Sequence, residues 1–523
     1  HHTTSPSGSK DRHENVSVDN PNYHSISAQV PPLQFDSHFE SGALHSAIRV
    51  GLRAYELILP LDCNTEGHTQ WFYFAVKGMV PGATYSFRVI NLEKPGSQFN
   101  AGNRICLYSA AKGYWERAGT HHAYYKSLYG PGLNVSATKL MYLLRFDVML
   151  SNFSDDTVYL AYHYPFTYTD MLKHVLEIEK KPTVRMQALT ITPLNRPLPL
   201  LTITDFSRSE EGKKTVVLTG RVHPGESNAS FVMAGLLEFL TSAHPVANVL
   251  RQSLIFKIVP MLNCDGVAVG VHRVSPASGN DLNRVWTSQL CSEKLHPEIF
   301  HVRKLFAALN ARNRHPVLYM DLHGHSRRRD LFVYACDARA AAFAGLLGAV
   351  PCSLVYPPGC RYGVPRDARE GSARVVVWRD FQMVLSLTLE ASYNGPSGTQ
   401  GLWFTPSCYA AAGAAVGRAM WVAHASDLWS QFAVETTEKS SEDQEREEER
   451  EGVSYRGEEE VEEVEDEDDD NEVEVYSKNS SAVTSDVESE TEDDGKVAGI
   501  LNDNENDEAE DDETSELQEE WLN

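Results

Sequence analysis

Long apolar runs and closely spaced cysteines are both missing from this chain of 523 residues. A membrane-spanning helix needs roughly 18 or more consecutive apolar residues, and no such run occurs, so we expect no membrane span. The first residues also lack the basic-then-apolar pattern of a secretory signal. The eight cysteines are scattered without a CxxC pair. In a long chain this indicates reduced thiols in the cytosol rather than a disulfide framework.

Basic residues are outnumbered, with 47 Lys and Arg against 72 Asp and Glu, but the deficit lies at one end of the chain. Residues 435–523 hold 39 acidic and 6 basic side chains, whereas residues 1–434 hold 33 acidic and 41 basic ones. The mildly basic body favours acidic substrates. Segments 1–30 and 433–523 have too little apolar area to offset the entropy of ordering, so we expect both to be disordered. The acidic tail either solvates the protein or competes with substrate for the body in a salt-sensitive way.

Two structured domains are expected between these segments. Residues 31–170 show short β-branched and aromatic segments separated by Gly and Pro turns, a pattern typical of an antiparallel β-sandwich. In residues 171–432 apolar strand candidates alternate with helical periodicity, which indicates an α/β domain with a mixed, mostly parallel central sheet. The expected strands of this second domain are 215–219, 254–259, 317–320, 331–334 and 383–389, and the expected helices include 227–240, 297–310 and 409–427.

A candidate metal site begins just after the expected strand 215–219, where His223 and Glu226 lie three residues apart. Imidazole and carboxylate are both good zinc ligands, and a catalytic zinc ion usually takes three protein ligands and keeps a fourth position open. His323, which follows the expected strand 317–320, can supply the third ligand. Alone, an HxxE sequence is more often a helix-start glutamate beside a surface histidine. An Asn-x-Ser sequence at Asn228 would place a glycan over this site, which again argues for the cytosol.

Five further polar residues fit hydrolysis of a peptide bond. Arg273 could polarise the scissile carbonyl, and Asp281 could orient a zinc-bound histidine through its second ring nitrogen. Asn283 and Arg284 would suit a terminal carboxylate, which a planar guanidinium binds well. Glu390, at the end of an apolar strand, could act as the general base. The competing interpretation is that the segment from Asp281 to Arg284 is a helix N-cap with a surface arginine. In the same interpretation, Glu390 is an edge-strand glutamate in a salt bridge.

Taken in order, these groups resemble those of the zinc metallocarboxypeptidases, and the sequences around them resemble the cytosolic carboxypeptidases in particular. The resemblance covers roughly residues 33–430, and its most specific stretches are 39–42, 67–74, 162–168, 323–326 and 371–379. It implies a zinc-carboxypeptidase domain preceded by a β-sandwich. It also implies roles by position: His223, Glu226 and His323 as ligands of one Zn²⁺, Glu390 as general base, Arg273 as the carbonyl-polarising residue, and Asn283 with Arg284 as the carboxylate-binding pair.

The resemblance further implies a substrate, because these enzymes trim glutamates from tubulin and other acidic tails. Arg374 and Arg369 match the basic residues of the specificity pocket. The loop after Arg273 is one residue longer than usual, and Tyr362 is a candidate for the tyrosine that closes over substrate. His325 is interpreted as packing rather than as a ligand. We expect a cytosolic enzyme, associated with microtubules where tubulin is the substrate, with neither nucleic acid nor a membrane as partner.

Two other functions are compatible with parts of the pattern. A catalytically silent module could bind tubulin or histones through the sandwich and the acidic tail, and it need hold no metal. A zinc-dependent deacylase of small amino-acid conjugates shares the HxxE and distant His layout. The complete set of ligand, base and anchor residues argues against the first alternative. The sandwich and the segment from Asp281 to Arg284 argue against the second.

Overall fold

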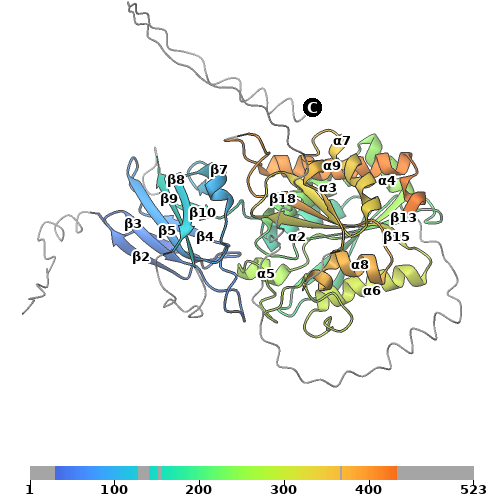
Figure 1. Cartoon of the computed structure of the whole chain (residues 1–523), viewed down its shortest axis with the longest axis horizontal. Helices are drawn as coiled ribbons and strands as arrows, with labels where there is room; N and C mark the ends of the chain where they lie inside the picture. The colour runs from blue at the N-terminus through green and yellow to red at the C-terminus, as the bar shows by residue number, and fades with distance from the viewer. Residues whose placement is uncertain (1–29, 128–140, 151–155, 365–367, 400, 433–523) are drawn as a thin grey trace, which may run out of the picture. The chain divides into compact units, whose positions relative to one another are not determined.

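The structure is a computed structural model that describes residues 30–127, 141–150, 156–364, 368–399 and 401–432. The terminal segments for which disorder is expected lie outside the described residues, apart from Val30. The expected class is confirmed: an α/β domain with a mixed sheet follows a β-sandwich (Figure 1).

The sandwich consists of two five-stranded sheets. Among its described residues, every pairing is antiparallel except that of β3 with β5, which is parallel because the intervening β4 belongs to the opposite sheet. In spatial order one sheet is β1 (Gln34–Asp36), β4 (Tyr73–Lys77), β10 (Val158–Ala161), β6 (Ile105–Ser109) and β7 (Tyr114–Ala118). The other is β2 (Ser46–Gly51), β3 (Ala54–Ile58), β5 (Thr84–Leu92), β9 (Tyr142–Met149) and β8 (Thr120–Lys126).

Aromatic side chains fill the space between these two sheets. Phe72, Phe74, Phe87 and Phe146 are each 0% exposed. Alternate residues of a strand point to opposite faces, so the aromatic positions of β4, β5 and β9 meet in one layer. Tyr393 of the second domain belongs to the same core cluster, so the sandwich core extends to the neighbouring domain.

The second domain is built on an eight-stranded sheet, in which β14, β13, β15 and β18 run parallel to one another. The outer pairs β11–β12, β12–β14 and β16–β18 are antiparallel, whereas β17 runs parallel to β16. In spatial order the strands are β11 (Val184–Ile191), β12 (Pro197–Ile203), β14 (Leu254–Val259), β13 (Lys214–Gly220), β15 (Pro316–His325), β18 (Ser386–Ser392), β16 (Leu331–Ala335) and β17 (Arg361–Tyr362).

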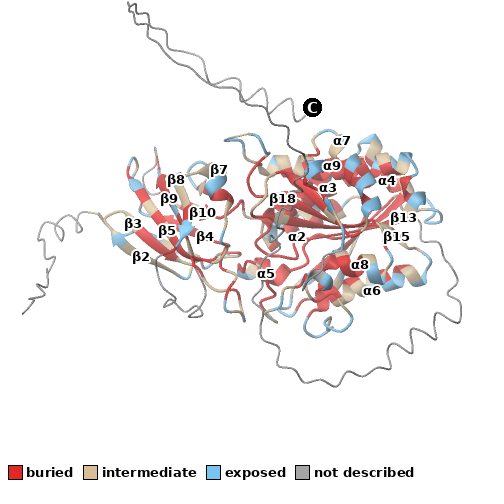
Figure 2. Cartoon of the chain, viewed as in Figure 1, coloured by how far each residue is buried: buried red, intermediate tan, exposed pale blue. Residues whose placement is uncertain are grey.

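Helices cover both faces of this sheet, with α3, α4, α7 and α9 on one face and α6 and α8 on the other (Figure 1). The central strands are consequently buried almost along their whole length, while the outer helix faces are exposed (Figure 2). The helices are α2 (Tyr168–Glu179), α3 (Ser227–Leu240), α4 (Pro245–Ser253), α5 (Cys264–Val269), α6 (Pro297–Ala311), α7 (Ala341–Ala349), α8 (Ala373–Asp380) and α9 (Pro406–Ala425). The 3₁₀ turns are η1 (Gln98–Ala101), η2 (Ala338–Ala340), η3 (Pro357–Gly359), η4 (Ala368–Gly371) and η5 (Leu428–Phe432).

The strands β11 and β12 were not expected from the sequence. Prolines are normally excluded from the interior of a sheet because they cannot donate to the strand ladder. Here Pro197 and Pro199 lie in β12, and the pairing of β11 with β12 shifts register between Ala188 and Thr190, beside Pro199. The pairing of β12 with β14 involves only residues 201–203, so both prolines lie where β12 has a neighbouring strand on one side alone.

Among the described residues no single helix is long and apolar enough to cross a membrane. The adjacent helices α3 and α4 meet the length and composition criteria only when taken together, across a bend of 88°.

Candidate active site

The turn after β13 holds His223 and Glu226 in one buried structure. Arg221 starts it in the left-handed region, with φ of 57°, and its side chain is only 1% exposed. The guanidinium donates to the Pro224 carbonyl at 2.8 Å and to the Ser230 hydroxyl at 2.8 Å. A buried arginine therefore ties the turn to the first residues of α3.

His223, Glu226 and His323 come together at the carboxyl end of the sheet. Nδ1 of His223 lies 2.7 Å from one Glu226 oxygen, and Nδ1 of His323 lies 3.1 Å from the other. One ligand atom from each residue falls within 4.8 Å of the others, and all three residues are buried. The structure thus brings the three sequence-predicted ligands to a single point.

The second nitrogen of each imidazole faces an aspartate. Nε2 of His223 lies 3.1 Å from Asp281, as expected for a carboxylate that orients a ligand. Nε2 of His323 lies 2.8 Å from Asp321, whose other oxygen accepts a hydrogen bond from Thr219 at 2.7 Å. A carboxylate at Nε2 favours the proton on that nitrogen and leaves the Nδ1 lone pair for a cation.

This donor set fits a zinc ion. Two Nδ1 atoms and one carboxylate are the ligands that catalytic zinc prefers, with a fourth position left open. Burial raises the pKa of Glu226, but the two histidines prevail and hold it well below its usual range. Burial also opposes protonation of His323, yet Asp321 and Glu226 raise its pKa well above the usual value. A proton and a metal ion therefore compete for the same nitrogen.

Asp321 is a site residue that the sequence analysis did not assign. It lies two residues before His323 on β15, so both side chains point to the same face of the strand. That alternation was the available signal, because an acidic residue two positions before a candidate ligand on a strand can reach its ring.

Gly324 and Asn228 close the space behind Glu226. The Gly324 N–H donates to Glu226 at 2.9 Å, and a Cβ at Gly324 would meet the Asn228 side chain at 2.1 Å. Asn228 is 0% exposed and donates to the Ala391 carbonyl at 2.5 Å. The folded protein therefore has no room for a glycan at Asn228.

Glu390 lies on β18 directly beside His323. The two residues are register partners in the parallel pairing of β15 with β18. Paired residues of neighbouring strands point to the same face of a sheet. Glu390, which is only 8% exposed, therefore points to the face of the sheet on which His323 lies.

Arg273 reaches the same cluster through Asp281, since its Nη2 lies 2.8 Å from the second oxygen of that carboxylate. Asp281 thus bridges Arg273 and His223. Burial alone would raise the pKa of Asp281. The lowering by Arg273 and His223 is larger, so the pKa lies well below its usual range. The carboxylate stays charged because both of its neighbours are positive or donate a proton.

Asn283 contacts the start of α8, which carries Arg374, and Arg284 lies against Gly371 just before that helix. The Asn283 side-chain oxygen accepts a hydrogen bond from the Ala373 N–H at 2.9 Å, so its amide N–H₂ is left to face other groups. The Arg374 guanidinium lies over the Tyr334 ring at 5.2 Å, and its Nε is buried without a hydrogen-bond partner among the described residues. The three residues thus come from neighbouring segments, and their roles in binding substrate stay predictions.

The remaining sequence candidates occupy other positions. Arg369 lies in η4, and its side chain is outside what the structure describes. Tyr362 lies on the edge strand β17, half-buried against the catalytic core, and burial raises its pKa to about 12. Nδ1 of His325 accepts the Arg328 N–H at 2.9 Å, which is the packing role expected for it.

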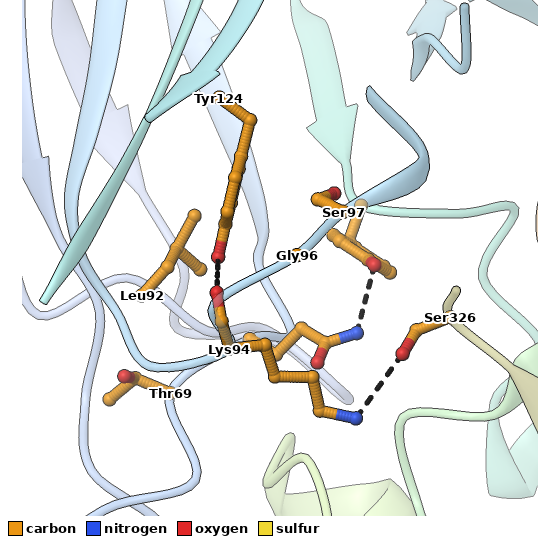
Figure 3. A pocket seen from close by; sticks show the side chains of 9 residues that line it. Thr69, Leu92, Lys94, Gly96, Ser97, Tyr124 and Ser326 are labelled. Atoms are coloured by element: carbon orange, nitrogen blue, oxygen red, sulfur yellow. Dashed lines mark hydrogen bonds between the residues drawn. The ribbon is translucent and has the colours of Figure 1, made fainter. Parts of the chain in front are cut away.

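A small pocket lies where the sandwich meets the catalytic domain (Figure 3). Lys94 of the sandwich extends across it and donates to the Ser326 hydroxyl at 3.2 Å. Ser326 follows His323 by three residues, so a sandwich lysine contacts the loop that leaves the candidate metal site.

Comparison with known proteins agrees with this geometry. A zinc carboxypeptidase profile matches residues 169–341, and a profile of the cytosolic carboxypeptidase N-terminal domain matches residues 35–138. Human cytosolic carboxypeptidase 1 is 39% identical over 419 residues, which are 72% of this chain and 34% of that protein. Human cytosolic carboxypeptidase 4 is 40% identical over 403 residues, covering 69% of this chain and 36% of that protein. The chain spans about a third of the length of these curated relatives.

Solved structures show the same fold at lower identity. A metallo-carboxypeptidase from Burkholderia cenocepacia is 22% identical with a TM-score of 0.62, covering 76% of this chain and all of that one. Together, the mixed sheet, the His–Glu–His cluster and the profile match define the second domain as a member of the zinc carboxypeptidase family. Within that class, the N-terminal match and the relatives place the chain in the cytosolic carboxypeptidase family.

Proposed function

We propose that this protein is a zinc-dependent carboxypeptidase of the cytosol that removes glutamates from polyglutamylated tubulin or other acidic protein tails. The observation that supports it most strongly is the convergence of His223, Glu226, His323 and Glu390 at one edge of the sheet. A site that only bound a partner would not need a buried acid beside three metal-ligating groups.

Each residue then has a defined task. His223, Glu226 and His323 would hold one zinc ion, which when bound lowers the pKa of a coordinated water to about 7. Glu390 takes a proton from the attacking water and returns it to the leaving amine. Arg273 donates hydrogen bonds to the carbonyl oxygen as negative charge develops on it.

Basic groups would select the substrate. Arg284 and the amide N–H₂ of Asn283, whose oxygen is held by the Ala373 N–H, bind the terminal carboxylate of the peptide. Arg374, whose buried Nε lacks a partner among the described residues, binds the side-chain carboxylate of a terminal glutamate. Arg369 is proposed as a second basic residue of the same pocket. A buried guanidinium disfavours an apolar terminal residue because it would lose its water without gaining an acceptor.

Mass spectrometry of glutamylated tubulin tail peptides tests the activity. The wild-type protein with zinc should release glutamates one at a time, Glu390→Gln should not, and the surface variant Glu238→Gln should match the wild type. A panel of linear and branched peptides would define which glutamates are removed. Failure of the zinc-loaded wild type to release glutamate from any peptide would rule out the proposed activity.

Metal content separates this proposal from a silent binding module. We expect one zinc ion per chain by elemental analysis and loss of that ion in a His223→Ala, His323→Ala double variant. A purified protein that holds no zinc yet binds glutamylated peptides would favour the binding module.

A further inference from the structure

One sandwich carboxylate accepts hydrogen bonds from three consecutive backbone N–H groups of the catalytic domain. Asp62 lies between β3 and β4 and is only 3% exposed. Its Oδ1 accepts a hydrogen bond from the His272 N–H at 2.6 Å. Its Oδ2 accepts from Arg273 at 2.6 Å and from Val274 at 3.1 Å. Successive N–H groups that converge in this way form an anion-binding concavity, and here the neighbouring domain supplies the anion.

The segment whose N–H groups bind Asp62, residues 272–274, contacts the candidate metal site twice. The first contact runs from Arg273 through Asp281 to His223, with distances of 2.8 and 3.1 Å. The second is the His272 carbonyl, which accepts the Gly225 N–H at 2.7 Å between the ligands 223 and 226. A Cβ at Gly225 would meet the His272 ring at 2.3 Å and the His272 carbonyl oxygen at 3.0 Å, so the turn lies directly against this segment. A shift of this segment would therefore move both Arg273 and the metal-ligating turn.

Other sandwich contacts hold the two flanks of the segment. Before it, the Ser41 hydroxyl donates to the Val267 carbonyl at 2.7 Å, and the Ser41 N–H donates to Ala268 at 3.0 Å. After it, the Asn64 amide donates to the Pro276 carbonyl at 3.0 Å. These neutral bonds place the flanks, whereas Asp62 provides the charge-assisted bonds at the centre.

We infer that Asp62 is a positioning residue of the active site. It fixes the backbone of residues 272–274 and so holds the Arg273 guanidinium where the scissile carbonyl oxygen becomes negative. Burial raises the pKa of Asp62 to about 6 against the opposing effect of the three N–H donors, so the carboxyl is ionised at neutral pH. The sandwich thereby takes a direct part in the chemistry of the neighbouring domain.

The kinetic test is a double-mutant cycle between Asp62→Asn and Arg273→Ala, measured on the full chain with zinc. Asp62→Asn keeps the shape but turns an N–H₂ group toward a backbone donor. A displacement of about 1 Å at a catalytic group can cost about 100-fold, so we expect kcat to fall roughly 10- to 100-fold with little change in KM. In the Arg273→Ala background the same change should cost less than about threefold, because only the contact of His272 with the metal-ligating turn is then left to be disturbed. Equal losses in both backgrounds would overturn the inference.

Hydrogen–deuterium exchange gives a readout that does not depend on activity. Asp62→Asn should speed exchange in the peptide that covers residues 272–274 and leave the sandwich core strands unchanged. The exchange experiment distinguishes the positioning role of Asp62 from the proposed carboxypeptidase function. A wild-type protein that is inactive on every peptide would refute the carboxypeptidase function but would not affect the exchange result. Unaltered exchange in that peptide would refute the positioning role. Asp62→Ser, which introduces no misdirected amide, serves as a second variant where Asp62→Asn does not fold.

The matched control is Asp156→Asn. Asp156 is a buried sandwich carboxylate that accepts hydrogen bonds from the Ala111 N–H and the Ser109 hydroxyl, both within the sandwich. This variant should lower the melting temperature but keep kcat and the exchange of residues 272–274 at wild-type values. If it lowered kcat as much as Asp62→Asn, sandwich stability rather than positioning would explain the effect.

Discussion

Aromatic rings fill the core of the sandwich, whereas charged side chains fill the carboxyl end of the catalytic sheet. In the sandwich, Phe87 and Phe146 lie 5.6 Å apart between ring centres, in contact that does not depend on hydrogen bonds. At the sheet end the side chains of His223, Glu226 and Asp281 are 4%, 11% and 12% exposed, and each faces an oppositely charged or donating partner. Apolar burial tolerates small shifts, whereas a buried charge is stable only when its partners are correctly placed.

This difference indicates that folding stability and catalytic chemistry depend on different regions of the protein. Apolar burial contributes free energy in rough proportion to area and has little directional preference. The sheet end gains little net stability from its ion pairs because desolvation offsets their attraction. Substitutions in the two regions should consequently change different measured quantities.

Glu390→Gln should give the largest effect and sharpen the contrast. Loss of the general base should lower kcat by about 10²- to 10⁴-fold. Because Gln has nearly the same volume, the unfolding midpoint and the zinc content should change little. Steady-state kinetics, calorimetry and elemental analysis measure the three quantities. Full activity of this variant would show that the proton acceptor is another residue.

Phe87→Ala should have the opposite signature. Phe87 is 0% exposed and packs against Phe35, Tyr55 and Phe146, so its removal should lower the free energy of unfolding by about 3–5 kcal/mol. Chemical denaturation measures the loss. The fraction that remains folded should keep its kcat. A large fall in kcat per folded molecule would break the separation between the two regions.

Glu298 is an exception to the rule that buried charges are paired. The pH dependence of the unfolding free energy should show this exception. Glu298 is 0% exposed in α6, and neither carboxylate oxygen has a hydrogen-bond partner among the described residues. Burial raises its pKa from the ordinary 4.5 to about 7. A raised pKa means that the folded state keeps a proton that the unfolded state releases above pH 4.5. Stability should therefore fall as pH rises from 4.5 to 7.

The isosteric variant Glu298→Gln tests this dependence because it is neutral at every pH. It should exceed the wild type by up to about 3 kcal/mol in unfolding free energy at pH 8, given about 1.4 kcal/mol per pKa unit. The two proteins should converge at pH 4.5 and below. Denaturant titrations across this range measure the difference. A difference that does not vary with pH would show that Glu298 does not titrate in this range.

Asp321→Asn should have the smallest effect. The amide keeps an acceptor for the Nε2 proton of His323 but removes the charge that makes the imidazole a stronger ligand. Zinc affinity should fall by about 10- to 100-fold. Competition with a chromophoric chelator measures it, and Asp205→Asn, at a partly exposed carboxylate away from the candidate metal site, serves as the control. Unchanged affinity would mean that Asp321 contributes to packing alone.

Periodicity and spacing in the sequence predicted the strands β13, β14, β15, β16 and β18 and placed His223, Glu226, His323 and Glu390 after or near strand ends. This succeeded because the carboxyl ends of parallel strands meet at one edge of a sheet. The same reasoning failed at β11 and β12, where Pro197 and Pro199 obscured the strand pattern. The prolines lie outside the part of β12 that pairs with β14, and the extent of that pairing cannot be predicted from the sequence of one strand.

The sequence by itself determined the kinds of group at the site, since a zinc ligand or a general base is a matter of residue type. The tertiary structure alone decided which distant groups hold them in place. Asp62 lies 211 positions before Arg273, and nothing local marks it, because its partners are backbone N–H groups that every residue except proline carries. Only the docking of one domain against the other turns three ordinary amides into a binding site for one carboxylate.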